Sequence, residues 1–184
     1  MSELGKLVAV RSLDKSLIKG RTFDFRPNRD FFHVEEEGAP EPVRVPIENL
    51  KAVFFIKTLG RAPSCVDKRS FENRVGPEKK VWIEFVDGEK MASWSSSFGS
   101  LRKGFFVFPA DPDSNTETAY VFRSAIDRVE EGEAAEEAAR AFNSSSDEPI
   151  SSVWDLKILP EAAPGTYRLS RKSRKRPSKD TSDR

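Results

Sequence analysis

Apolar residues in the first 130 positions of the chain come in short runs, which polar residues and turn-forming residues interrupt. Residues 81–86 form such a run, rich in β-branched and aromatic side chains, and it leads into Asp87-Gly88, a dipeptide typical of a two-residue hairpin. The runs predict strands over residues 7–12, 18–25, 30–35, 43–45, 50–56, 81–86, 90–94, 104–108, 118–122 and 126–129.

The predicted strands fall into two sets of five that repeat each other. Val8 matches Val81 and Phe25 matches Phe98, both at an offset of 73 residues. The offset grows to 74 where the phenylalanine pair 31–32 is aligned with the pair 105–106, and it reaches 76 further on. It changes only where turns are expected, as in a duplicated β unit. The pairs matched at 76 are Val45 with Val121, Leu50 with Ile126 and Val53 with Val129.

Five short strands within about fifty residues describe a small, strongly bent barrel of the SH3 or Sm type, which closes its edges. We therefore predict a mainly β protein with two tandem small barrels, at residues 5–56 and 79–131, joined by a linker over residues 57–78. A barrel of about fifty residues buries only a thin core on its own. We expect the two barrels to pack on each other.

The phenylalanine pairs support that packing, because adjacent strand residues point to opposite faces. Phe31-Phe32 and Phe105-Phe106 should each send one ring inward and one outward, and we expect the outer rings to meet the other copy rather than a ligand. Residues 53–56 are apolar throughout, whereas the matching residues 129–132 turn acidic. The last strand of the first copy is therefore expected to be buried on both faces.

After residue 131 the apolar period changes to that of a helix. Ala135, Ala138, Ala139 and Phe142 stand at positions i, i+3, i+4 and i+7, which predicts a short amphipathic helix over residues 132–143. Because its apolar face is mostly alanine, we expect it to dock on the second barrel with modest burial.

Residues 144–184 are predicted to be a flexible tail that contains one hydrophobic peptide, residues 153–159. Two interpretations of this peptide stay open: a strand that docks back on a barrel edge, and a recognition segment for another protein. The partner-binding residues we predict there are Trp154, Leu156, Ile158 and Leu159.

Charge is partitioned along the chain although the total is close to neutral. The formal net charge is +1, yet residues 130–148 sum to −6 and residues 171–184 to +5. A near-neutral total excludes a uniformly basic nucleic-acid-coating protein, and 10% aromatic residues with 33% charged ones exclude a disordered or membrane-embedded chain. The basic tail is either a solubilising end or a contact for nucleic acid, anionic lipid or an acidic partner.

Candidate catalytic chemistry is sparse. His33 and Cys65 are the only histidine and the only cysteine, so we predict neither a transition-metal site nor an intramolecular disulfide. No P-loop, dinucleotide-binding glycine motif or nucleophile elbow is present. We therefore expect a cytoplasmic protein that is not an enzyme and carries no cofactor.

Basic residues gather in the first copy with phenylalanines between them. Residues 5–34 hold seven Lys or Arg against three Asp, and Phe23 and Phe25 lie among them. This pattern fits an anionic ligand or single-stranded nucleic acid, and it equally fits a solvated barrel exterior. The anion-binding candidates, including those of the tail, are Arg21, Arg26, Arg29, Arg171, Lys172, Arg174, Lys175 and Arg176.

Two family resemblances follow from these residues. The stretches 53–61, 86–88 and 104–112 resemble an uncharacterised bacterial domain of myxobacterial type, sometimes found beside PilZ domains; the resemblance covers roughly residues 45–130 and brings no catalytic residues. The barrel also distantly resembles PilZ, which binds cyclic di-GMP through Arg-x-x-x-Arg followed by Asp/Asn-x-Ser-x-x-Gly. Here the arginines of 26–29 stand one residue too close, and the segment 14–20, with its glycine one residue too late, precedes them. A cyclic dinucleotide is therefore not expected.

Together these observations favour a non-catalytic adaptor or regulatory binding protein in a bacterial signalling or motility-type assembly, with another protein as its partner. The alternative is a nucleic-acid-binding protein that uses an Sm-like barrel and the basic tail. We expect no membrane span, because the chain has no apolar run of 18 residues.

Overall fold

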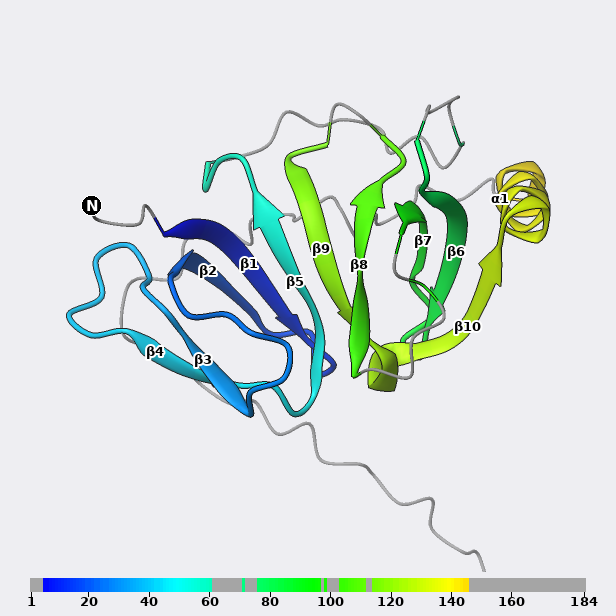
Figure 1. Ribbon diagram of the computed structural model, residues 1–184. Helices are drawn as coiled ribbons and strands as arrows, with labels where there is room; N and C mark the ends of the chain where they lie inside the picture. Colours follow the sequence, from blue (N-terminus) through cyan, green and yellow to red (C-terminus); the bar gives the residue numbers. More distant parts are fainter. Residues whose placement is uncertain are drawn as a thin grey trace, which may run out of the picture.

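The computed structural model describes residues 5–60, 71, 76–96, 98, 103–111 and 114–145. These residues form a mainly β structure with one α-helix, and all ten predicted strands are present (Figure 1). The first five strands are β1 (Lys6–Ser12), β2 (Leu17–Thr22), β3 (Phe31–Val34), β4 (Val43–Pro46) and β5 (Leu50–Ile56). The second five are β6 (Lys79–Phe85), β7 (Lys90–Ser95), β8 (Gly104–Pro109), β9 (Thr116–Phe122) and β10 (Ile126–Glu131), with a 3₁₀ turn at Arg123–Ala125 and helix α1 at Glu133–Ser145.

Eight of the strands form one antiparallel sheet, in the order β10-β6-β7-β8-β9-β5-β1-β2. Strands β3 and β4 form a separate hairpin, which is tied to β2 by an isolated bridge between Arg21 and Glu35. In Figure 1 this hairpin lies at one end of the molecule and α1 at the opposite end. Within each half the pairing order is the same, with the fifth strand beside the first, the first beside the second and the third beside the fourth.

The register of these pairs repeats residue by residue. Val8 pairs with Phe55 in the first half, and the residues at offsets of 73 and 76, Val81 and Glu131, pair in the second. Each fifth strand carries a β-bulge, and the bulge residues Lys51 and Asp127 are also 76 positions apart. Two halves that share both register and bulge have the same local architecture.

The predicted alignment of the phenylalanine pairs is wrong by one residue. Phe105 pairs with Val121 and Phe32 pairs with Val45, so Phe32 is the counterpart of Phe105, at an offset of 73 rather than 74. Burial agrees, since both rings are buried, whereas His33 and Phe106 face outward. Sequence identity favoured the wrong alignment because the second half has Gly104 where the first has Phe31.

The two separate closed barrels expected from the repeat are not formed. The eight-stranded sheet is open, ending at β10 and β2, and β5 pairs with β9 of the other half (Figure 1). The repeat specified which strands pair within a half. It did not specify whether a fifth strand pairs with the fourth strand of its own half or of the other.

Strand β5 is buried along its whole length, as predicted, because it separates two cores. Val53 and Phe55 face the first core, which also contains Val8, Val10 and Phe32. The opposite face of β5 contributes to a second core, which it shares with strands of the second half. The members of the second core are Ala9, Ala52, Phe54, Ile56, Val81, Ile83, Phe85, Met91, Phe105, Val107, Ala119, Val121 and Ala125.

Helix α1 confirms the predicted C-terminal helix and extends two residues further. It follows Gly132, whose φ of +65° suits glycine, and it packs on the outer face of the second half. Ala135 and Ala139 are buried there, and the ring of Phe142 lies 5.6 Å from that of Trp82. No helix within the described residues is long and apolar enough to cross a membrane.

Candidate functional site

An aromatic groove of about 250 Å³ opens where the two halves meet. Its first-half residues come from the start of β1, from the end of β2 with the following loop, and from β5; its second-half residues come from β8 and β9. The residues that line the aromatic groove are Gly5, Lys6, Thr22, Phe23, Phe25, Pro27, Phe55, Phe106 and Thr118.

Hydrogen bonds fix the loop over residues 23–30, which forms one wall of the aromatic groove. The backbone N–H of His33 donates to Asp24 Oδ1 at 2.9 Å, and the ring Nδ1 of His33 lies 2.8 Å from Asp24 Oδ2. Arg29 N–H donates to the Arg26 carbonyl at 3.1 Å, which closes a turn. Burial tends to raise the pKa of Asp24, but the hydrogen bonds from His33 and the charges of His33 and Arg29 outweigh it and lower that pKa.

Aromatic rings form the floor of the aromatic groove. Phe25 lies 5.7 Å from Phe55 and 5.8 Å from Tyr120 between ring centres, and Phe106 lies 5.0 Å from Tyr120 and 6.4 Å from Phe55. Most of these rings meet edge to face, the arrangement that aromatic pairs prefer. Phe106 is 38% exposed and Phe23 is 55% exposed, so the groove presents ring surface to solvent.

Glycine at position 5 makes room for Phe23. A Cβ atom at Gly5 would lie 2.6 Å from Phe23 Cζ, which is closer than carbon atoms approach in proteins. The Phe23 ring therefore lies directly against the backbone of Gly5, where β1 begins.

The three predicted arginines of the first half lie in three different environments. Arg21 is on β2, and its Nη1 donates to the Gly5 carbonyl at 3.1 Å, beside the aromatic groove. Arg26 stands between the lining residues Phe25 and Pro27, and Arg29 is exposed three residues later. Other basic residues of this region lie elsewhere, so residues 5–34 do not form one cationic patch: Arg11 pairs with Glu89 of the second half.

The remaining predicted site residues lie outside the part of the chain that the structure describes. They are Trp154, Leu156, Ile158, Leu159, Arg171, Lys172, Arg174, Lys175 and Arg176.

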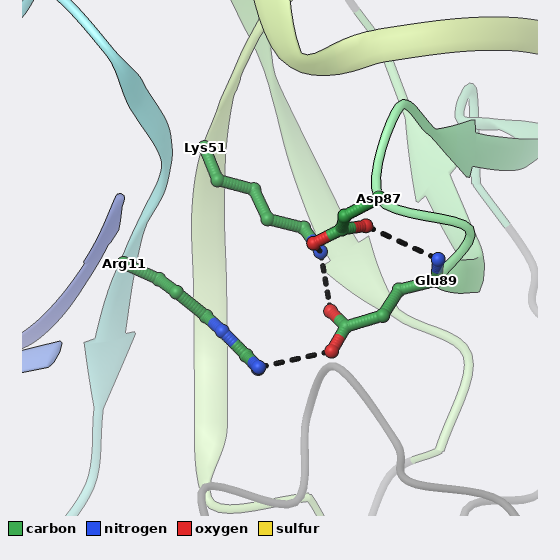
Figure 2. Close-up of polar contacts among 4 residues, drawn as sticks. All are labelled: Arg11, Lys51, Asp87 and Glu89. Carbon is green, nitrogen blue, oxygen red and sulfur yellow. Dashed lines mark hydrogen bonds and ion pairs between the residues drawn. The ribbon is translucent and has the colours of Figure 1, made fainter. Parts of the chain in front are cut away.

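A second cluster, the buried ion cluster, consists of Arg11, Lys51, Asp87 and Glu89 (Figure 2). The Lys51 side chain is completely buried, and its Nζ donates to Asp87 Oδ2 at 2.6 Å and to Glu89 Oε2. Glu89 Oε1 accepts a hydrogen bond from Arg11 Nη2 at 2.9 Å. Lys51 Nζ also lies 4.3 Å from the centre of the Phe85 ring. Two positive groups of the first half thus meet two negative groups of the second.

Local backbone geometry places these charges. Lys51 is the bulge residue of β5, and bulges redirect a side chain relative to its neighbours on the strand. Asp87 and Glu89 flank Gly88, whose φ is +84°, in the β6–β7 turn. The hairpin is a three-residue loop rather than the predicted two-residue one, because Phe85 N–H bonds to the Glu89 carbonyl and Gly88 N–H to the Phe85 carbonyl.

The charges of the buried ion cluster compensate one another. Burial tends to raise the pKa of Asp87. Hydrogen bonds from the Lys51 ammonium and the Glu89 backbone N–H, together with the charges of Lys51 and Arg11, lower this pKa overall. An ionised Asp87 beside an ammonium group suits an ion pair rather than proton transfer at neutral pH. We assign this cluster to holding the two halves together.

Sequence reasoning missed Lys51 and the second-half side of the aromatic groove. A signal for Lys51 was present, since it is the one charged residue in the apolar run 50–56. No local signal could place Phe106 beside Phe55, because that contact depends on the pairing of β5 with β9. Within the described residues, no group of three or more His, Cys, Asp and Glu side chains could hold a metal ion.

Comparison with known proteins gives a family but no characterised relative. No curated protein matches the chain, and no solved structure matches it. Residues 5–131 match the model of a family of unknown function, DUF6982, and this match spans both halves of the repeat. Because it covers more than half of the chain, the protein belongs to the DUF6982 family.

Proposed function

We propose that the protein is a non-catalytic binding protein that recognises another protein through the aromatic groove. The observation that carries this proposal is the exposed aromatic surface of Phe23 and Phe106 at the junction of the two halves. Exposed aromatic rings in a concave site are typical of protein-recognition surfaces, where they provide large contact areas with few flexible bonds.

The size of the aromatic groove supports a side chain as the bound group. Its volume of about 250 Å³ is below the roughly 300–1,000 Å³ of pockets that enclose a cofactor or metabolite. The groove is also preorganised, because Asp24 anchors its loop and Phe55 comes from the fully buried β5. A rigid groove loses little entropy when a partner binds.

Comparative capture from extracts of the native organism tests the proposal. Tagged wild-type protein would be compared with Phe106→Ser, Trp154→Ala and Val86→Ser. Val86 is the control because it is also an exposed apolar residue, at 56%, but lies in the β6–β7 turn away from the groove. A partner retained by wild type and Val86→Ser, and lost with Phe106→Ser, supports recognition by the groove. A partner retained by Phe106→Ser but lost with Trp154→Ala would move recognition to the C-terminal peptide.

One observation favours nucleic acid as a second candidate ligand. Lys6 Nζ lies over the Phe55 ring of the groove, and the Arg21 guanidinium is held at Gly5, against which the exposed Phe23 ring lies. Positive charge next to stacking surfaces is characteristic of single-strand-binding proteins. Binding of an oligonucleotide would then weaken steeply with salt concentration. Absence of retardation of any oligonucleotide at low salt would eliminate this alternative.

A further inference from the structure

Among the described residues that line the aromatic groove, the charged one is a lysine, Lys6. Lys6 Nζ lies 5.4 Å from the centre of the Phe55 ring, and the Arg21 guanidinium is held at Gly5. Among the described residues that line the groove there is no Asp or Glu. Asp24 stands between two lining phenylalanines in the sequence, and its carboxylate accepts hydrogen bonds from the His33 backbone and, at 3.5 Å, from the Thr22 hydroxyl, while its other oxygen lies against the His33 ring.

We propose that the aromatic groove binds an acidic peptide segment of a partner protein, with an aromatic side chain in the groove and a neighbouring Asp or Glu beside Lys6. This inference rests on the proposed function and names the chemistry of its ligand. Shape selects the aromatic side chain, because the rings of the groove floor pair edge to face with one another and can contact a further ring in the same way. Charge complementarity selects the acid.

The same features favour a peptide over a nucleic acid. A strand of nucleic acid is held by several cations that follow successive phosphates, with bases stacked between them. Here Lys6 is the single charged residue among the described lining residues, and the groove volume suits one side chain rather than a series of bases. Arg11, which the sequence places with the basic residues of this region, is bound to Glu89 instead.

Titration of labelled full-length protein, followed by backbone amide resonances, tests the proposal. The probes are three ten-residue synthetic peptides: one phenylalanine among four glutamates, the same peptide with alanine for phenylalanine, and the same peptide with glutamines for glutamates. A fourth probe is oligothymidine of ten nucleotides. The protein variants are Lys6→Gln, Phe106→Ser, the more exposed Phe23→Ser as a second groove variant, and Trp154→Ala, with Val86→Ser as the control.

The acidic aromatic peptide is expected to shift the amide resonances of Lys6, Phe23 and Phe106. Lys6→Gln should weaken the binding of this peptide by about two- to fivefold, the range for an exposed ion pair. Either phenylalanine variant should weaken peptide binding about tenfold or more through lost apolar contact. Val86→Ser should leave the affinity for the peptide unchanged. The alanine and glutamine peptides should each bind several times more weakly than the parent.

Four results would overturn the proposal, in distinguishable ways. Equal binding of the glutamine peptide, with no effect of Lys6→Gln, would remove the acid preference and leave the proposed function standing. Shifts with oligothymidine but no peptide would replace protein recognition by nucleic-acid binding. Binding that emerges only in a Trp154→Ala chain would show that the groove holds this chain's own C-terminal peptide. If no probe moves any groove resonance, the proposed function fails as well.

Discussion

Lys51 shows how one residue joins the two halves of the molecule. It lies in an otherwise apolar strand, it is completely buried, and both of its anionic partners come from the other half. The bulge of β5 turns this side chain toward the β6–β7 turn, where Asp87 and Glu89 receive it. A buried charge with its partners in place is tolerated, whereas one left without a partner is costly.

Replacing Lys51 by methionine should therefore destabilise the protein by about 3 kcal/mol, because two carboxylates lose their buried partner. Urea unfolding at neutral pH measures the change, and Lys57→Met, at an exposed position just beyond β5, is the control that should change little. Combining Lys51→Met with Asp87→Asn should show a coupling of at least about 1 kcal/mol. Simple additivity of the two changes would contradict the ion pair.

Acid should weaken the structure through Asp87 and similar carboxyl groups. The pKa of Asp87 is lowered in the folded protein from an ordinary value of 3.8, so the folded state holds this proton less tightly than the unfolded state does. Its stabilisation is present above the unfolded pKa and is lost as pH falls through the folded pKa. Asp14, Asp24 and Glu84 also have lowered pKa values and act in the same direction.

The free energy of unfolding should therefore fall as pH drops below about 4. In Asp87→Asn the value at neutral pH should be lower and the acid decline shallower, since one titrating group is gone. Denaturant unfolding at a series of pH values measures both. An unchanged acid slope in Asp87→Asn would refute the assignment to this carboxyl group.

At the scale of elements, the two halves provide an internal comparison of the same hairpin. The first turn of each half places its αL residue at equivalent positions, Lys15 with φ of +71° and Gly88 with φ of +84°. Asp14 and Asp87 each accept a backbone N–H two residues on, at 2.9 and 3.1 Å. The turns differ mainly in whether glycine occupies the strained position.

Removing the glycine at one αL position and introducing a glycine at the other should change the free energy of unfolding in opposite directions. Gly88→Ala should cost about 1 kcal/mol, because a side chain is strained in the left-handed region. Lys15→Gly should stabilise by less than this, since glycine also gains freedom in the unfolded chain. Urea unfolding of the two variants measures both signs. A stabilising Gly88→Ala would be inconsistent with the turn geometry.

At the scale of the whole molecule, β5 makes the halves interdependent. It pairs with β1 of its own half and β9 of the other, and its two faces lie in different cores. Neither core keeps all of its walls if the other half unfolds. Independent tandem barrels would not share a strand in this way.

Thermal unfolding is therefore expected to be a single transition, with a calorimetric enthalpy equal to the van't Hoff enthalpy. Phe54→Ala should lower its midpoint without splitting it, because Phe54 is buried in the second core while its strand belongs to the first half. Two resolved transitions in the wild-type protein would show that the halves unfold separately.

The strands and their repeat were predictable from the sequence because both depend on local pattern. A continuous apolar run bounded by polar and turn residues located β5 to the residue, and matching apolar positions such as Val53 and Val129 set the true offset of the fifth strands. The assembly of the halves was not predictable, since pairing of β5 with β9 is a long-range choice between similar edges. The aromatic groove was missed for the same reason, because Phe106 reaches it only through that pairing.

The shared strand also affects how the chain is made. When a ribosome has synthesised the first half, the face of β5 that carries Ala52, Phe54 and Ile56 lacks most of its core, because that core is completed by residues up to Ala125. About 70 further residues must be added, which takes roughly 3–14 s at ordinary translation speeds. During that interval the nascent protein exposes an apolar strand with an unpaired edge, the kind of surface that aggregates. We expect its yield in cells to depend on chaperones that bind the nascent chain during this interval.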